Sequence, residues 1–148
     1  MTARVEPFSR DLVRGVLDEM GLHYLRDRDD DLIVDFERDE ETGRQIRLWL
    51  IAGGSEEDVF QVLIHADRTF SDDESSAMLV AVNEWNDTRR WPQVALTRLA
   101  SGQCKIAGAF SLPVKEGIHA PLLRDVIETM IAVGHDFWRW LGEEHGIV

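Results

Sequence analysis

The sequence has very little cysteine and no long apolar run, and both deficits exclude classes of protein. A single cysteine, Cys104, in 148 residues excludes an internal disulfide framework and a cysteine-based zinc site. No stretch approaches the ~18 apolar residues of a membrane-spanning helix, and the first residues lack the apolar core of a secretion signal. We therefore expect a protein of the cytoplasm that does not bind a membrane.

Basic residues are also scarce, and this deficit argues against nucleic acid as a partner. Lys and Arg total 16 against 28 Asp and Glu, which gives a formal charge of −12. The basic patch that a nucleic-acid-binding domain needs is missing, and an anionic lipid surface would repel the chain. Most of the negative charge lies in residues 1–75, with 20 acids and 9 bases. This acidic half is either a solubilising surface or a face that selects basic partners.

The motifs of common catalytic and metal sites are absent from the sequence. It has no glycine-rich phosphate loop, no Gly-x-Ser-x-Gly nucleophile motif and no His-Glu-x-x-His metal signature. Residues 27–31 imitate the start of a calcium loop, but Leu32 stands at the position of the required glycine and Arg38 at that of the bidentate glutamate. We interpret this run as a turn, and we predict no catalytic residue, no metal and no cofactor.

Hydropathy periods and turn residues predict one α+β domain spanning residues 1–148. Ser9 can cap a helix over residues 9–20, Ser71 and Glu74 form a capping box for a helix that ends near residue 89, and a long helix follows over 120–144. Alternating apolar residues predict strands within 23–36 and over 45–52, 59–66, 94–99 and 105–112. The order α-β-β-β-α-β-β-α, with short connections, indicates a sandwich of helices on a mainly antiparallel sheet.

The last helix is apolar over an unusually wide arc. Its apolar residues cover about 180° of the helix surface, whereas a helix packed on one sheet typically needs a stripe of ~100°. The extra width predicts a second packing partner, and the simplest one is another copy of the chain. We expect a homodimer whose interface includes Ile131, Trp138 and Trp140. The alternative is a wide stripe that faces the core of the same chain.

The second helix ends in an unusual run of amide, aromatic and arginine side chains. Asparagine is a weak helix former, so two of them on one side of a helix suggest a specific role. Their amides either satisfy nearby backbone groups or belong to a contact surface rich in the residue types of binding hot spots. The candidate binding residues are Asn83, Trp85, Asn86, Arg89, Arg90 and Trp91.

This run resembles a known family. Asn83-Glu-Trp85-Asn86, followed by Arg89-Arg90-Trp91-Pro92 and a strand, is similar to the signature region of YbjN-type proteins, bacterial proteins described as sensory-transduction regulators. The final helix, with Leu123, Ile127, Phe137-Trp138 and Leu141, is similar too, so the match covers about residues 71–141. The resemblance implies a fold like that of type III secretion chaperones, which commonly dimerise, and it implies no catalytic residues.

Two functions of different classes follow from these observations. The first is a non-enzymatic, dimeric protein-binding module with a chaperone-like or regulatory role, whose partner is a protein or peptide. The alternative is a sensor of a small anion, or an unrecognised enzyme, in which Asn83, Asn86 and Arg90 present amide and guanidinium donors.

Overall fold

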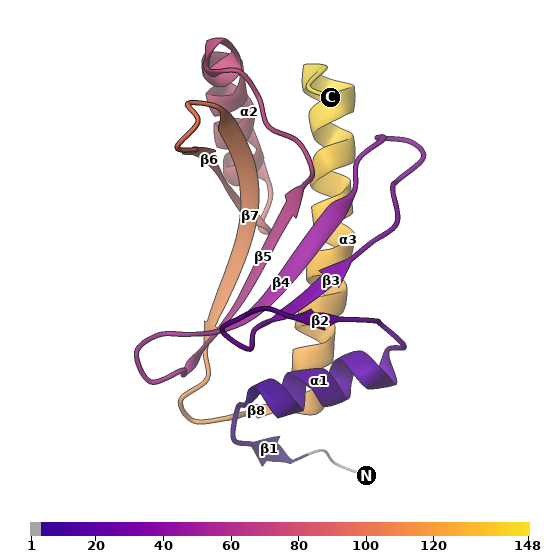
Figure 1. Ribbon diagram of the computed structural model, residues 1–148, viewed down its shortest axis with the longest axis vertical. Helices are drawn as coiled ribbons and strands as arrows, with labels where there is room; N and C mark the ends of the chain where they lie inside the picture. The colour runs from indigo at the N-terminus through magenta and orange to yellow at the C-terminus, as the bar shows by residue number, and fades with distance from the viewer. Residues whose placement is uncertain (1–3) are drawn as a thin grey trace.

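A computed structural model describes residues 4–148 and shows an α+β fold built on one antiparallel sheet (Figure 1). The sheet has six strands in the order β2-β3-β4-β5-β7-β6, and every neighbouring pair is antiparallel. The strands are β2 (Leu25–Arg26), β3 (Leu32–Asp35), β4 (Ile46–Gly53), β5 (Val59–Ala66), β6 (Gln93–Arg98) and β7 (Cys104–Pro113). The short strands β1 (Val5–Glu6) and β8 (Ile118–His119) pair separately.

The three predicted helices are present and begin close to the predicted positions. They are α1 (Arg10–Glu19), α2 (Ser75–Thr88) and α3 (Ala120–His145), and a short 3-10 helix, η1 (Asp72–Glu74), precedes α2. The Ser9 hydroxyl accepts the Leu12 N–H at 3.1 Å, which caps α1. Ser71 and Glu74 form the predicted capping box, although it starts η1 rather than α2 itself.

The segment predicted as a first strand region is a small hairpin of β2 and β3. Its turn is the acidic run that imitates a calcium loop: Asp27 Oδ1 accepts the N–H groups of Asp29 at 2.8 Å and of Asp31 at 3.0 Å. The sequence analysis did not anticipate β1 and β8, because two-residue strands leave no alternating pattern to detect.

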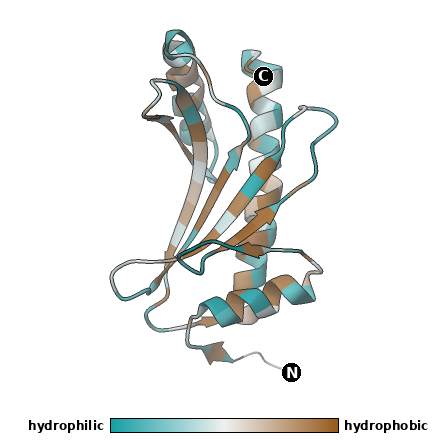
Figure 2. Cartoon of the chain, in the orientation of Figure 1, coloured by the Kyte–Doolittle hydropathy of each residue, from teal (hydrophilic) through white to brown (hydrophobic). Residues whose placement is uncertain are grey.

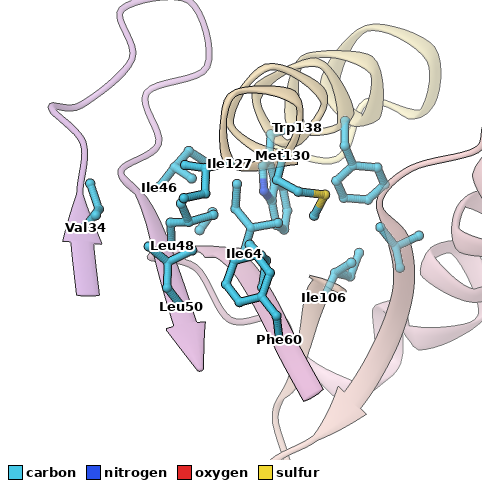
Figure 3. Close-up of a cluster of buried hydrophobic side chains, with 14 of the residues drawn as sticks. Val34, Ile46, Leu48, Leu50, Phe60, Ile64, Ile106, Ile127, Met130 and Trp138 are labelled. Atoms are coloured by element: carbon cyan, nitrogen blue, oxygen red, sulfur yellow. The ribbon is translucent and has the colours of Figure 1, made fainter. Parts of the chain in front are cut away.

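The core lies between one face of the sheet and α3. Alternate strand residues point into it, so that Leu48 and Leu50 of β4 and Ile64 of β5 face Ile127 and Met130 of α3 (Figure 3). The helix approaches β5 so closely that a Cβ atom at Gly134 would lie 2.1 Å from Ile64 Cδ1. A larger residue at this position would force the Ile64 side chain to shift, which favours glycine where α3 crosses the sheet.

The wide apolar arc of α3 is used within the chain. Besides the sheet, α3 contacts α1 near its start and α2 near its end. Trp138 is only 2 % exposed and lies under the Arg44 guanidinium, 5.1 Å from its ring centroid. Trp138, predicted to lie in a dimer interface, is thus a core residue covered by its own chain, and the homodimer itself stays a prediction. Sequence periodicity cannot distinguish a helix covered by three neighbours from one covered by a partner.

The opposite face of the sheet has no such cover. In Figure 1 helices α2 and α3 lie behind the sheet, and the face toward the viewer is left open. The strand side chains that alternate with the core residues are partly exposed along β4 and β5 and at the start of β7. Hydrophobic and hydrophilic residues are mixed along these strands (Figure 2).

Candidate functional site

Asn86, near the end of α2, is bound to the sheet rather than free for a ligand. Its side-chain oxygen accepts the Val94 N–H at 2.9 Å, and its Nδ2 donates to the Val94 carbonyl at 2.9 Å. Val94 belongs to β6, the edge strand, and these backbone groups face away from β7. The Asn86 amide therefore makes the hydrogen bonds that a neighbouring strand would make with Val94. Of the two roles considered for this segment, it has the one of satisfying nearby backbone groups.

Trp85 anchors the turn that connects α2 to β6. It is 1 % exposed, and its Nε1 donates to the Pro92 carbonyl at 2.9 Å. Its ring packs edge-on against Phe137 of α3, with centroids 5.0 Å apart. Trp85 is therefore a core residue that positions the chain entering β6, and its side chain is not available to a partner.

The other four candidates of this segment are exposed. The Arg89 guanidinium lies over the Trp85 ring at 4.9 Å, and Trp91 is 41 % exposed. No side-chain hydrogen bond or ion pair of Asn83 or Arg90 occurs within residues 4–148. An anion site composed of Asn83, Asn86 and Arg90 would need the Asn86 amide, which Val94 already occupies.

The remaining candidates for a dimer interface are partly buried. Ile131 and Trp140 both pack against the core of their own chain. The Trp140 ring lies 5.2 Å from Trp85 and 4.9 Å from His145, so much of it is already in contact. The predicted interface residues thus do not form one exposed surface on α3.

The open face of the sheet is a surface whose residues the sequence did not identify. We define it by the partly exposed apolar residues Ile33, Trp49, Ile51, Leu63, Ala107 and Ala109. Leu63 pairs with Trp49 on one side and with Ala109 on the other, so it stands near the middle. A signal was present in the sequence: 48–51 and 62–64 are unbroken apolar runs, which are typical of strands with apolar residues on both faces.

The rings of Trp49 and His65 meet on this face. Their centroids are 5.1 Å apart in an edge-to-face arrangement. The Trp49 Nε1 and the His65 Nδ1 are both buried and have no hydrogen-bond partner within residues 4–148. Burial lowers the pKa of His65, and the nearby cations Lys105 and Arg47 lower it further. The imidazole is therefore neutral at pH 7.

Charged groups beside these rings nearly balance. Arg47 makes a bidentate pair with Asp35, with Nε to Oδ1 at 2.6 Å and Nη2 to Oδ2 at 2.9 Å. The hydrogen bonds from Arg47 lower the pKa of Asp35, and burial together with the Arg47 charge lowers the pKa of Lys105. Asp67, at the edge of this region, pairs with Arg38 at 2.8 Å, so three bases stand near two acids here. This end of the open face therefore carries no net negative charge, in a chain whose formal charge is −12.

The single cysteine is a core residue, and the potential metal ligands among the described residues are scattered. Cys104 is 1 % exposed and lies in the core, as a small apolar residue would. In the described part of the chain, residues 4–148, no three His, Cys, Asp or Glu side chains are grouped so that they could hold a metal ion. None of the helices in the same residues has the length and apolar character needed to cross a membrane.

Comparison with known proteins gives one family and one fold. Residues 9–143 match the profile of the family "YbjN: Putative bacterial sensory transduction regulator". A search of curated proteins finds no match. Among solved structures the chain is similar to "YbjN, a putative transcription regulator from E. coli", with a TM-score of 0.74 and 11% sequence identity over 95% of this chain and 96% of that one.

The family match and the structural match agree with each other. The family profile extends well beyond the segment on which the resemblance was first noticed, and it includes the acidic first half of the chain. The likeness to the E. coli protein, at its low identity, shows that the fold is shared over nearly the whole of both chains. The chain belongs to the YbjN family.

Proposed function

We propose that this chain is a non-enzymatic regulatory module of the cytoplasm that acts by binding proteins and works as a homodimer. The observation that carries the proposal is the open face of the sheet, where apolar side chains of β3, β4, β5 and β7 are partly exposed and no helix of residues 4–148 lies over them. Contiguous exposed apolar surface on a soluble domain usually marks a protein contact. The description of the family as regulators supports a role in regulation rather than in catalysis.

The charge distribution supports a second copy as the occupant of this face. Two chains that each carry −12 repel one another over most of their surfaces. At one end of the open face Arg38, Arg47 and Lys105 offset Asp35 and Asp67, so two copies can approach there without this penalty. A two-fold axis would also let bases of one copy meet acids of the other, which is how isologous interfaces become self-complementary.

Sedimentation velocity over a range of concentrations tests this proposal. The wild-type chain should sediment as a dimer, and Leu63→Asp should sediment as a monomer, because it buries an unpaired carboxylate in the middle of the interface. Val80→Asp is the matched control, since Val80 is 63 % exposed on α2, away from the open face, and should leave the dimer intact. Far-UV circular dichroism confirms that both variants fold. A monomeric wild type, or a dimeric Leu63→Asp, would refute the interface.

A further inference from the structure

Strand β7 is longer than its neighbour β6 and extends past it. The β6–β7 pairing ends at Gln93 and Ala109, whereas the pairing of β7 with β5 continues to Pro113. Phe110 to Pro113 therefore have a neighbouring strand on one side only. Unpaired strand edges of this kind accept an added strand from another polypeptide.

The backbone of Ser111 points to this open side. The Val114 N–H donates to the Asp58 carbonyl on the β5 side, and the Leu99 N–H donates to the Gln103 carbonyl on the β6 side. Because backbone groups alternate between the two neighbours, the N–H and C=O of Ser111 face away from β5. No hydrogen bond to them from that side occurs among residues 4–148. Two backbone groups are thus presented to a partner.

An apolar pocket lies beside this edge, on the helix side of the sheet. Trp91 from the turn before β6, Phe110 and Leu112 from β7, and Leu122 and Met130 from α3 line it. Trp91 and Leu122 are 41 % and 43 % exposed, which is high for such large apolar residues. The pocket has a volume of about 200 Å³, below the roughly 300–1,000 Å³ of typical small-molecule sites. It suits one large apolar side chain better than a whole metabolite.

One charged residue, Asp125, lines the same pocket. It projects from α3, it is exposed, and it makes no ion pair with another residue of 4–148. A carboxylate beside an apolar pocket favours an occupant that carries an apolar group and a positive charge. The overall charge of −12 adds a long-range attraction for basic segments.

We propose that β7 and this pocket bind an extended basic peptide segment of a partner protein. The segment adds a strand to β7 at Ser111, places a large apolar side chain in the pocket, and directs a Lys or Arg two positions away toward Asp125. That spacing follows because alternate residues of a strand share one face and lie about 7 Å apart. The inference rests on the proposed function, since it assumes that the chain acts by binding a protein.

The probe is a phage-displayed library of short random linear peptides, selected on the folded wild-type chain. Enriched sequences should contain an aromatic or large aliphatic residue with Lys or Arg two positions away. Synthetic versions of these peptides should bind Asp125→Lys at least about tenfold more weakly, because the charge is reversed. Ser111→Pro should weaken binding similarly, since it removes an outward N–H but no bond to β5.

Matched controls separate the groove from general charge effects. Glu144→Lys makes the same change of charge on α3, outside the pocket, and should keep wild-type affinity. Enriched peptides without a basic residue, or peptides that bind Asp125→Lys and Ser111→Pro as well as the wild type, would overturn the inference. A library that yields no binder would overturn it too.

The outcomes for the groove and for the proposed function can be told apart. If no peptide is enriched but Leu63→Asp still converts a dimer to a monomer, the groove is wrong and the dimer stands. If the chain is monomeric but binds Asp125-dependent peptides, the dimer is wrong and the groove stands. Peptides whose binding is lost in Leu63→Asp but unchanged in Asp125→Lys would place the peptide on the open face and overturn the inference.

Discussion

The role of Asn86 gives the sharpest test of the structure. Asn86→Ala removes both hydrogen bonds to Val94, each 2.9 Å long. A hydrogen bond contributes about 1 kcal/mol net, and a buried backbone group left unpaired costs about 1–3 kcal/mol. Val94 is 4 % exposed, so water replaces the lost partners poorly. After offsetting the better helix propensity of alanine, about 0.5 kcal/mol, we expect a destabilisation of about 2–4 kcal/mol.

Two further variants isolate the cause. Asn86→Asp keeps an acceptor for the Val94 N–H but directs a carboxylate oxygen at the Val94 carbonyl, so it should destabilise at least as much as the alanine variant. Asn83→Ala, one turn earlier on the same helix, removes an exposed amide that makes no side-chain hydrogen bond within residues 4–148. It should leave stability unchanged or raise it by about 0.5 kcal/mol, through the better helix propensity of alanine.

Equilibrium unfolding in urea, followed by far-UV circular dichroism and tryptophan fluorescence, measures all three variants at one protein concentration. The midpoint should fall for Asn86→Ala and Asn86→Asp with little change in slope, which indicates a change of stability rather than of compactness. If Asn86→Ala is as stable as Asn83→Ala, the amide does not hold the edge of β6. That result would instead favour the hypothesis that Asn86 binds a ligand.

Three more predictions concern packing and titration. Gly108→Ala should destabilise the protein by about 1–3 kcal/mol in urea unfolding, because the new Cβ would lie 2.8 Å from Pro92 Cγ and 2.9 Å from Ile64 Cγ2. Gly→Ala in a compatible strand usually stabilises, so a stabilised variant would contradict this packing. Trp138→Ala should lower the free energy of unfolding by about 3–5 kcal/mol in the same assay, since the side chain is 2 % exposed. If the variant were instead a folded monomer of wild-type stability, Trp138 would belong to a dimer interface. Because the pKa of His65 is lowered in the folded chain, the unfolded chain binds a proton at this residue near pH 6.5, whereas the folded chain binds it only at lower pH. The free energy of unfolding should therefore fall as the pH drops through and below 6.5. His65→Gln should lose less stability than the wild type over this range in thermal melts. Equal losses would show that burial and the neighbouring cations Lys105 and Arg47 do not lower the pKa of His65.

The sequence by itself determined the three helices, the main strands and their order. Helix starts at Ser9 and Ser71 were readable because capping side chains act on backbone groups only two or three residues away. Strands were readable because alternation is a local pattern, and 59–66 was predicted with the bounds that the structure shows. The segment from Asn83 to Pro92 also indicated the family to which the chain belongs.

Tertiary structure alone decided which surfaces are covered. The apolar arc of α3 was predicted to need a second partner, yet α1, α2 and the sheet bury its centre and leave only residues such as Ile131 and Trp140 partly exposed. The residues of the open face and of the β7 edge could not be identified in this way. A strand sequence shows which residues share a face, but not whether a helix lies over that face or how far the neighbouring strand extends. Covering depends on contacts between segments far apart in the chain, and local periodicity carries no information about those.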